Sequence, residues 1–274
     1  MEFVETYLPL ILLMLASGLI GGLLAGLMGI GGGIVIVPVL DFALGFVGVD
    51  PDVRMHVAVA TSLATIIPTS ISSSRAHFRR GAVDFSLVKK WGPAIFLGAA
   101  LGSWIAARVD GSGLAAVFAI VALFVAVKMI LPLEKSRLAE QVPGGVAGVV
   151  PPGIIGIISA LMGIGGGALS VTTLTLFNVP IHRAVGSSAF FGLLIAVPGT
   201  IGFMLTGQGH ALLPPGSVGF VNVIGFAVLS PATFLAAPLG ARIAHALSQR
   251  QLSMTFGSFL MIVAARMLYR AFIS

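Results

Sequence analysis

Long apolar runs fill nearly the whole chain, and only short polar segments separate them. A helix that crosses a membrane needs about 20 apolar residues at about 1.5 Å of rise each, and several runs reach that length. The pattern predicts an all-α integral membrane protein with about 8–10 membrane segments. The predicted segments are Leu8–Met28, Ile34–Phe46, Val57–His77, Trp91–Val109, Leu114–Leu131, Pro152–Met162, Ala168–Phe177, Ala184–Gly207, Val218–Leu247 and Leu252–Phe272.

The string LMGIGGG occurs twice, at Leu27–Gly33 and at Leu161–Gly167, with an offset of 134 residues. His56–Ser70 resembles His182–Thr200 at an offset of 126, and LGSWIAARV resembles LGARIAHAL at an offset of 138. Such similarity predicts two related halves. We assign a first transmembrane repeat to residues 1–132, a cytoplasmic linker to 133–148 and a second transmembrane repeat to 149–274.

Composition agrees with a membrane environment. Hydrophobic residues make up 57% of the chain and charged residues only 9%, against about 25% in soluble domains. The chain has no cysteine, which excludes disulfides and thiolate chemistry. Its net charge of +6 comes from basic residues in short loops between apolar runs, which favours the positive-inside rule over a nucleic-acid surface.

The basic loops also predict orientation. Five Lys and Arg residues between Arg75 and Lys90 place that loop in the cytoplasm, and the linker lies on the same side. Five crossings per half would make the two repeats inverted, whereas four would make them parallel. We prefer inverted repeats.

The glycine clusters predict broken helices, because glycine is a poor helix former and new short runs start directly after them. Such breaks survive in a membrane only beside packed protein or a cavity. The N–H groups that begin the next helix are unpaired and lie at its positive end, which suits an anion. The alternative role of small residues is close helix packing. The candidate binding residues are Gly29, Gly31, Gly32, Gly33, Gly163, Gly165, Gly166 and Gly167.

Hydroxyl side chains inside the apolar runs are the second candidate group. Thr61, Ser62, Ser187 and Ser188 could donate to an oxyanion or form hydrogen bonds between helices. Ionisable residues near the ends of the runs are candidates for proton transfer or gating, with an interfacial structural role as the alternative. These residues are Asp41, Arg75, His77 and Asp84.

The sequence contains no His-Glu-x-x-His motif, no Gly-x-Ser-x-Gly elbow and no phosphate-binding or dinucleotide-binding glycine motif. We therefore expect no enzyme activity, no metal and no cofactor.

Several motifs in order resemble the TauE/SafE (sulfite exporter, TSUP) family of membrane transporters. They are GLLAGLMGIGGGIVIVPVL, ATS followed by HFRRGAVD, ALMGIGGG, AVGSS with PGT, and LGARIAHALSQRQL. The resemblance implies transport of sulfite, sulfonates or other organosulfur anions across a bacterial cytoplasmic (inner) membrane. The second half lacks the His–Arg-rich loop of the first, so we expect no symmetric counterpart of His77 or Asp84.

Together these patterns predict a secondary transporter of a small anion, with the glycine breaks forming the site between the repeats. The alternatives are an anion channel, a transporter of a small carboxylate, and a scaffold that transports nothing. The expected partners are the small anionic substrate and the lipid bilayer. Nucleic acid is not expected, and the sequence leaves open whether the protein is a homo-oligomer.

Overall fold

The computed structural model describes residues 2–29, 31–131, 143–243 and 249–273. Within these residues the chain forms ten helices and one two-stranded antiparallel sheet, so the predicted all-α membrane fold is confirmed. The helices are α1 (Glu2–Met28), α2 (Gly33–Phe46), α3 (Pro51–Phe78), α4 (Phe85–Ala106), α5 (Gly111–Ile130), α6 (Gly145–Met162), α7 (Gly167–Leu176), α8 (Ile181–Thr206), α9 (Val223–Ile243) and α10 (Gln249–Ile273). The strands are β1 (Ser217–Val218) and β2 (Val221–Asn222).

Helix lengths suit a membrane. Segments of α1, α3, α5, α8 and α9 are long and apolar enough to cross it. By contrast, α2 has 14 residues and α7 has 10, so they cover about 21 and 15 Å, or roughly two thirds and one half of a hydrocarbon core. Large apolar side chains on the outside, such as Leu97, Phe124 and Leu235, are exposed as lipid contact requires.

The predicted linker differs in part from the structure. Residues 132–142 lie outside the described residues, but α6 already begins at Gly145, so the last four residues of the predicted linker belong to this helix. Proline disfavours helix interiors, and the predicted run began only at Pro152. Pro151 and Pro152 nevertheless lie inside α6, since packed neighbours in a membrane protein can compensate for the lost hydrogen bonds.

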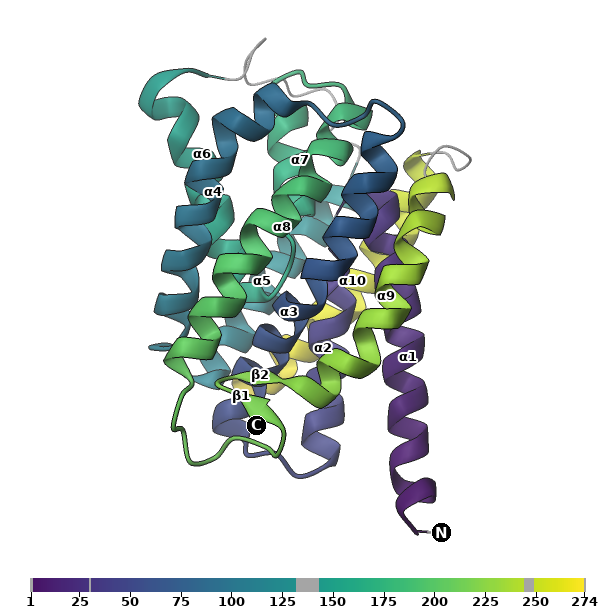
Figure 1. Cartoon of the computed structure of the whole chain (residues 1–274), viewed down its shortest axis with the longest axis vertical. Helices are drawn as coiled ribbons and strands as arrows, with labels where there is room; N and C mark the ends of the chain where they lie inside the picture. Colours follow the sequence, from purple (N-terminus) through teal and green to yellow (C-terminus); the bar gives the residue numbers. More distant parts are fainter. Residues whose placement is uncertain (1, 30, 132–142, 244–248, 274) are drawn as a thin grey trace.

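Helices of one half pack against helices of the other. The main pairs are α1 with α9, α4 with α6, α5 with α10, and α3 with α8 (Figure 1). When each helix is replaced by the one five places away in the chain, the first two pairs exchange and the last two are unchanged. Two related halves would produce this exchange, and the repeat relation itself stays a prediction.

The central helices α3 and α8 run in opposite directions. His56 near the start of α3 and Phe203 near the end of α8 both contact the ring of Phe220, at centroid distances of 4.9 and 6.2 Å. At the other end, Ser187 in α8 contacts Asp84 in the loop that follows α3. In Figure 1 the sheet lies at the lower end, and the loop between α3 and α4 lies at the upper end. We call these the sheet end and the basic end.

Candidate functional site

Both copies of LMGIGGG interrupt a helix, so the predicted breaks are confirmed. We call residues 29–32, between α1 and α2, the first break, of which residue 30 lies outside the described residues, and residues 163–166, between α6 and α7, the second break. Left-handed backbone conformations with φ between +68° and +80° are found in both, and side chains other than glycine rarely adopt them. The glycines with positive φ are Gly29, Gly31, Gly32, Gly163 and Gly166.

The two breaks cross each other in the centre of the molecule. A Cβ atom added to Gly31 would lie 2.9 Å from the Cα of Gly165, and one added to Gly33 would lie 2.1 Å from the carbonyl oxygen of Gly163. Neither distance leaves room for a side chain. The structure therefore brings the two predicted half-sites together, and it gives the glycines a packing role at the same place.

The last turns of α1 and α6, which precede the two breaks, have their carbonyl groups satisfied in different ways. Ser73 and His77 of α3 donate hydrogen bonds to the carbonyl oxygens of Ala25 and Gly26 in the last turn of α1, at 3.3 and 2.9 Å. In α6 the backbone closes the turn itself, because Ile164 donates to the oxygen of Ser159 in a Schellman motif. His77, a predicted gating residue, thus supports the end of α1.

The helix start after the second break carries unpaired amides. Ser170 is the first residue of α7 whose N–H bonds back along the chain, to the oxygen of Gly166 at 2.8 Å. The N–H groups of Gly167, Ala168 and Leu169 have no hydrogen-bond partner in the part of the chain that the structure describes. Gly167 and Ala168 are buried, so these amides lie inside the protein at the positive end of a helix.

Two of the four predicted hydroxyl residues lie beside the breaks. Ser62 donates to the carbonyl oxygen of Gly163 at 2.7 Å and so joins α3 to the second break. Ser188 lies beside Gly29, and its fully buried hydroxyl has no partner among the described residues. A polar side chain in this state is unusual, because buried hydroxyls are nearly always hydrogen-bonded.

The other two hydroxyls lie at opposite ends of the α3–α8 pair. The backbone N–H of Asp84 donates to Ser187 at 3.0 Å at the basic end, and that of Asn222 donates to Thr61 at 2.9 Å at the sheet end. We call these contacts the Asp84–Ser187 latch and the Asn222–Thr61 latch. Each joins the segment before a helix of one half to the central helix of the other half.

The expectation that Asp84 has no symmetric counterpart was wrong. Thr61 and Ser187 match at the offset of 126, and Asp84 and Asn222 match at the offset of 138. The Asp84 carboxylate caps α4 by accepting from the N–H of Leu87, and the Asn222 side chain accepts likewise from Gly225 before α9. The sequence comparison missed the match between Asp84 and Asn222, because the basic loop before α4 corresponds to the two-stranded sheet before α9, which has no arginines.

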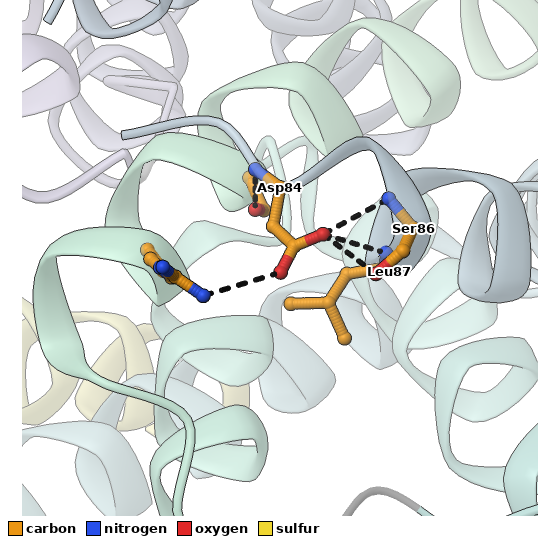
Figure 2. A network of polar contacts seen from close by, with 5 residues as sticks. Asp84, Ser86 and Leu87 are labelled. Atoms are coloured by element: carbon orange, nitrogen blue, oxygen red, sulfur yellow. Dashed lines mark hydrogen bonds and ion pairs between the residues drawn. The ribbon is translucent and has the colours of Figure 1, made fainter. Parts of the chain in front are cut away.

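Asp84 carries an additional charge network at the basic end. Its carboxylate accepts hydrogen bonds from the hydroxyl and the N–H of Ser86 and lies 4.0 Å from the guanidinium of Arg183 (Figure 2). The Ser86 hydroxyl first, and then the backbone amides and Arg183, lower the pKa of Asp84 below its ordinary value, while burial acts in the opposite direction. The carboxylate therefore stays ionised at neutral pH.

The other two predicted gating residues, Asp41 and Arg75, lie apart from the contacts around Asp84. Asp41 lies two turns into α2, where it is buried and forms an ion pair with Arg54 of α3 at 3.4 Å. Arg75 is exposed near the end of α3. Neither is recorded in contact with the break glycines, whose nearest neighbours are backbone groups, apolar side chains and serines.

Sequence reasoning missed Ser159 and Ser170 beside the second break and Asn222 at the sheet end. Ser159 and Ser170 flank the second break, and both have fully buried hydroxyls without a partner among the described residues. Comparing the two copies at the offset of 134 could have found them, since the first copy has Ala25 and Ile36 there.

A separate pocket of about 310 Å³ opens at the sheet end. Its walls include His56, Asp110, His210 and Phe220, and none of the predicted binding residues lines it. His56 donates from Nε2 to the carbonyl oxygen of Val109 at 2.9 Å and stacks on Phe220. The ring is thus held by the fold between α3, the α4–α5 loop and the sheet.

Comparison with known proteins gives one family. The model of the family described as "Sulfite exporter TauE/SafE" matches residues 14–267. A Haemophilus influenzae protein named "Probable membrane transporter protein" is 35% identical over 257 residues, which cover 94% of this chain and 97% of that protein. The "Probable membrane transporter protein YunE" of Bacillus subtilis is 28% identical and covers 96% of this chain and 98% of its own length. No solved structure matches the chain at a significant level.

Proposed function

The chain belongs to the sulfite exporter TauE/SafE family of membrane transporters, and from that premise we propose that it is a secondary transporter of a small organosulfur or sulfur oxyanion. Members of this family are membrane transporters and not enzymes, and this chain is a multi-pass membrane transporter as well. The finer proposal is that the anion binds where the two glycine breaks cross, with sulfite and sulfonates as the first candidates.

One observation carries this proposal: a helix begins inside the protein with unpaired amides. The N–H groups of Gly167, Ala168 and Leu169 are unpaired at the start of α7, directly after Gly163 and Gly165, which lie against the first break. Helix starts of this kind bind anions in transporters built from broken helices, because the amides donate and the helix dipole is positive there. A neutral backbone site also explains how an anion could bind without a buried lysine or arginine next to the glycines.

The two latches supply a route to alternating access. Each latch fixes the segment before α4 or α9 of one half onto α8 or α3 of the other half. Release of the Asp84–Ser187 latch would let the halves separate at the basic end, and release of the Asn222–Thr61 latch would do so at the sheet end. We propose that the two latches open in turn, as rocking of one half against the other about a fixed site requires.

Ligand-dependent stability of the purified protein tests the proposed function. Sodium sulfite, thiosulfate, methanesulfonate and acetate should be compared, because a ligand that binds only the folded state raises the melting temperature. At a ligand concentration of 100 times Kd the free energy of unfolding rises by about 2.7 kcal/mol. We expect sulfite or methanesulfonate to raise it. A panel without any shift would contradict the proposal and favour the scaffold, and a larger shift with acetate would favour a carboxylate transporter.

A pair of glycine variants tests the location. Gly31 and Gly48 both have φ of +80°, but a Cβ atom on Gly31 meets Gly165, whereas one on Gly48 meets nothing within 4 Å. Both alanine variants should lose about 1–2 kcal/mol through backbone strain, and Gly31→Ala should lose more because its methyl group also meets the backbone of Gly165. Only Gly31→Ala should also abolish the ligand-induced shift, and equal shifts in both variants would place the site elsewhere.

Flux into proteoliposomes separates a transporter from a channel. A secondary transporter should show saturable uptake that a proton or sodium gradient drives above equilibrium. Uptake that only follows the anion's own electrochemical gradient, without saturation, would favour the anion channel.

A further inference from the structure

The two breaks have the same seven residues but different neighbours. At the offset of 134, Ala25 corresponds to Ser159 and Ile36 corresponds to Ser170. The first break is thus flanked by apolar side chains at two positions where the second is flanked by hydroxyls. This difference distinguishes the chemistry of the two breaks, since their glycines are identical.

Both additional hydroxyls lie around Gly166, the residue that caps α7. The oxygen of Ser159 lies 3.0 Å from the place that a Cβ atom on Gly166 would occupy. Ser170 lies one turn into α7, and its N–H bonds to the oxygen of Gly166. Helical side chains lean toward the helix start, so the Ser170 hydroxyl lies at the same end as the unpaired amides.

Neither hydroxyl has a hydrogen-bond partner among the described residues, and both side chains have 0% exposure. Buried hydroxyls without partners are rare, and two of them beside three unpaired amides form a set of donors that lacks an acceptor. The oxygens of an anion would supply that acceptor.

We propose that the second break coordinates the transported anion: Ser159, Ser170 and the amides at the start of α7 donate to its oxygens. This inference rests on the proposed function. The ligand is a small oxyanion with a single negative charge, such as a sulfonate or hydrogensulfite. A helix start supplies only about half a positive charge, and the groups around the break glycines are backbone, apolar or serine, which leaves a second charge uncompensated.

Binding measurements on the full-length protein in detergent test the proposal. Ser159→Ala and Ser170→Ala remove one hydroxyl each. Ser230→Ala in α9 is the matched control, because its buried hydroxyl also lacks a partner in the described part of the chain, and Ser230 is not among the nearest neighbours of any break glycine. Calorimetric titration with sodium methanesulfonate should give a Kd about tenfold or more higher for the first two variants, as for hydrogen bonds to a charged group, and an unchanged Kd for the control.

A single thiol gives a second readout. The chain has no cysteine, so Ser170→Cys introduces a unique reactive group. Saturating methanesulfonate, at about ten times Kd, should slow its modification by a small methanethiosulfonate reagent about tenfold. Sodium sulfate at the same concentration should leave the rate nearly unchanged.

The outcomes separate this inference from the proposed function. If methanesulfonate binds the wild type and both alanine variants equally, or does not protect the thiol, the coordinating role of the second break is wrong and the transporter proposal stands. Protection by sulfate as strong as by methanesulfonate would overturn the preference for a single charge. If the wild type binds none of sulfite, methanesulfonate, thiosulfate and acetate, the proposed function fails, and this inference fails with it.

Discussion

The two latches have the same geometry and different chemistry. In each, the residue that caps a helix donates its backbone N–H to a hydroxyl on a central helix of the other half, at 3.0 Å for Asp84–Ser187 and 2.9 Å for Asn222–Thr61. Asp84 is charged and partly exposed beside Arg183, whereas Asn222 is neutral and 7% exposed. The comparison teaches that two contacts with the same backbone geometry can respond differently, because the charged Asp84 can respond to protons and salt and the neutral Asn222 cannot.

The largest expected effect comes from exchanging the two caps. In Asn222→Asp, the carboxylate can no longer donate to the oxygens of Pro215 and Ser217, which the Asn222 amide reaches at 3.1 and 3.3 Å. We expect a loss of about 2–4 kcal/mol of unfolding free energy, because a buried charge faces a carbonyl oxygen. The reciprocal change, Asp84→Asn, keeps a good helix cap and should cost less than about 1 kcal/mol.

Thermal unfolding of both variants in one detergent measures this difference. Gly144→Ala is a suitable control, since its added methyl group meets nothing within 4 Å and its φ of −98° suits alanine. Equal losses in the two cap variants would show that the environments of the latches do not differ in energy.

A smaller effect is expected when the acceptor of each latch is removed. Thr61→Val leaves the N–H of Asn222 unpaired in a fully buried contact, and we expect a loss of about 1–2 kcal/mol. Ser187→Ala exposes the N–H of Asp84 to a partly buried site, where water can replace the hydroxyl, so about 0.5 kcal/mol is expected. Hydrogen exchange of residues 82–87 and 219–225 would show which segment each variant releases. Release of both segments by either variant would mean that the latches are coupled and do not open separately.

Much of the fold could be predicted from the sequence, because membrane helices depend on long apolar runs that are visible without contacts. The helix breaks at LMGIGGG followed from the glycines, and the shortness of α2 and α7 followed from the short apolar runs after them. The start of α6 at Gly145 could not be predicted, since the cost of Pro151 and Pro152 is offset by neighbours that only the fold supplies.

The candidate site was less predictable, because the role of a hydroxyl depends on its partner. Thr61 and Ser62 are adjacent in sequence and were assigned one role, yet Thr61 accepts from Asn222 at the sheet end while Ser62 donates to Gly163 at the break. Ser159 and Ser170 gave no signal by themselves. Their importance follows from burial without a partner, which is a property of the packed structure and not of the residue type.

The smallest effect, a pH response, should appear at the basic end only. The Ser86 hydroxyl and the other donors hold the pKa of Asp84 below its ordinary value, so the folded protein binds this proton less readily than the unfolded chain does. The stabilisation from Asp84 is therefore complete above the unfolded pKa of about 3.9 and is lost as the pH falls through the lower folded value. Because the carboxylate is partly exposed, the loss should stay below about 1 kcal/mol.

Hydrogen-exchange protection factors, corrected for the intrinsic effect of pH, measure this response. Between pH 7 and pH 5 both latches should keep their protection, and between pH 4 and pH 3 only residues 82–87 should lose some of it, while residues 219–225 should not, because Asn222 does not titrate. Asp84→Asn is the matched control and should remove the pH dependence at the basic end without opening it. Loss of protection at both ends over the same pH range would mean that another group controls the opening, and the charge of Asp84 would then have no separate role in the latch.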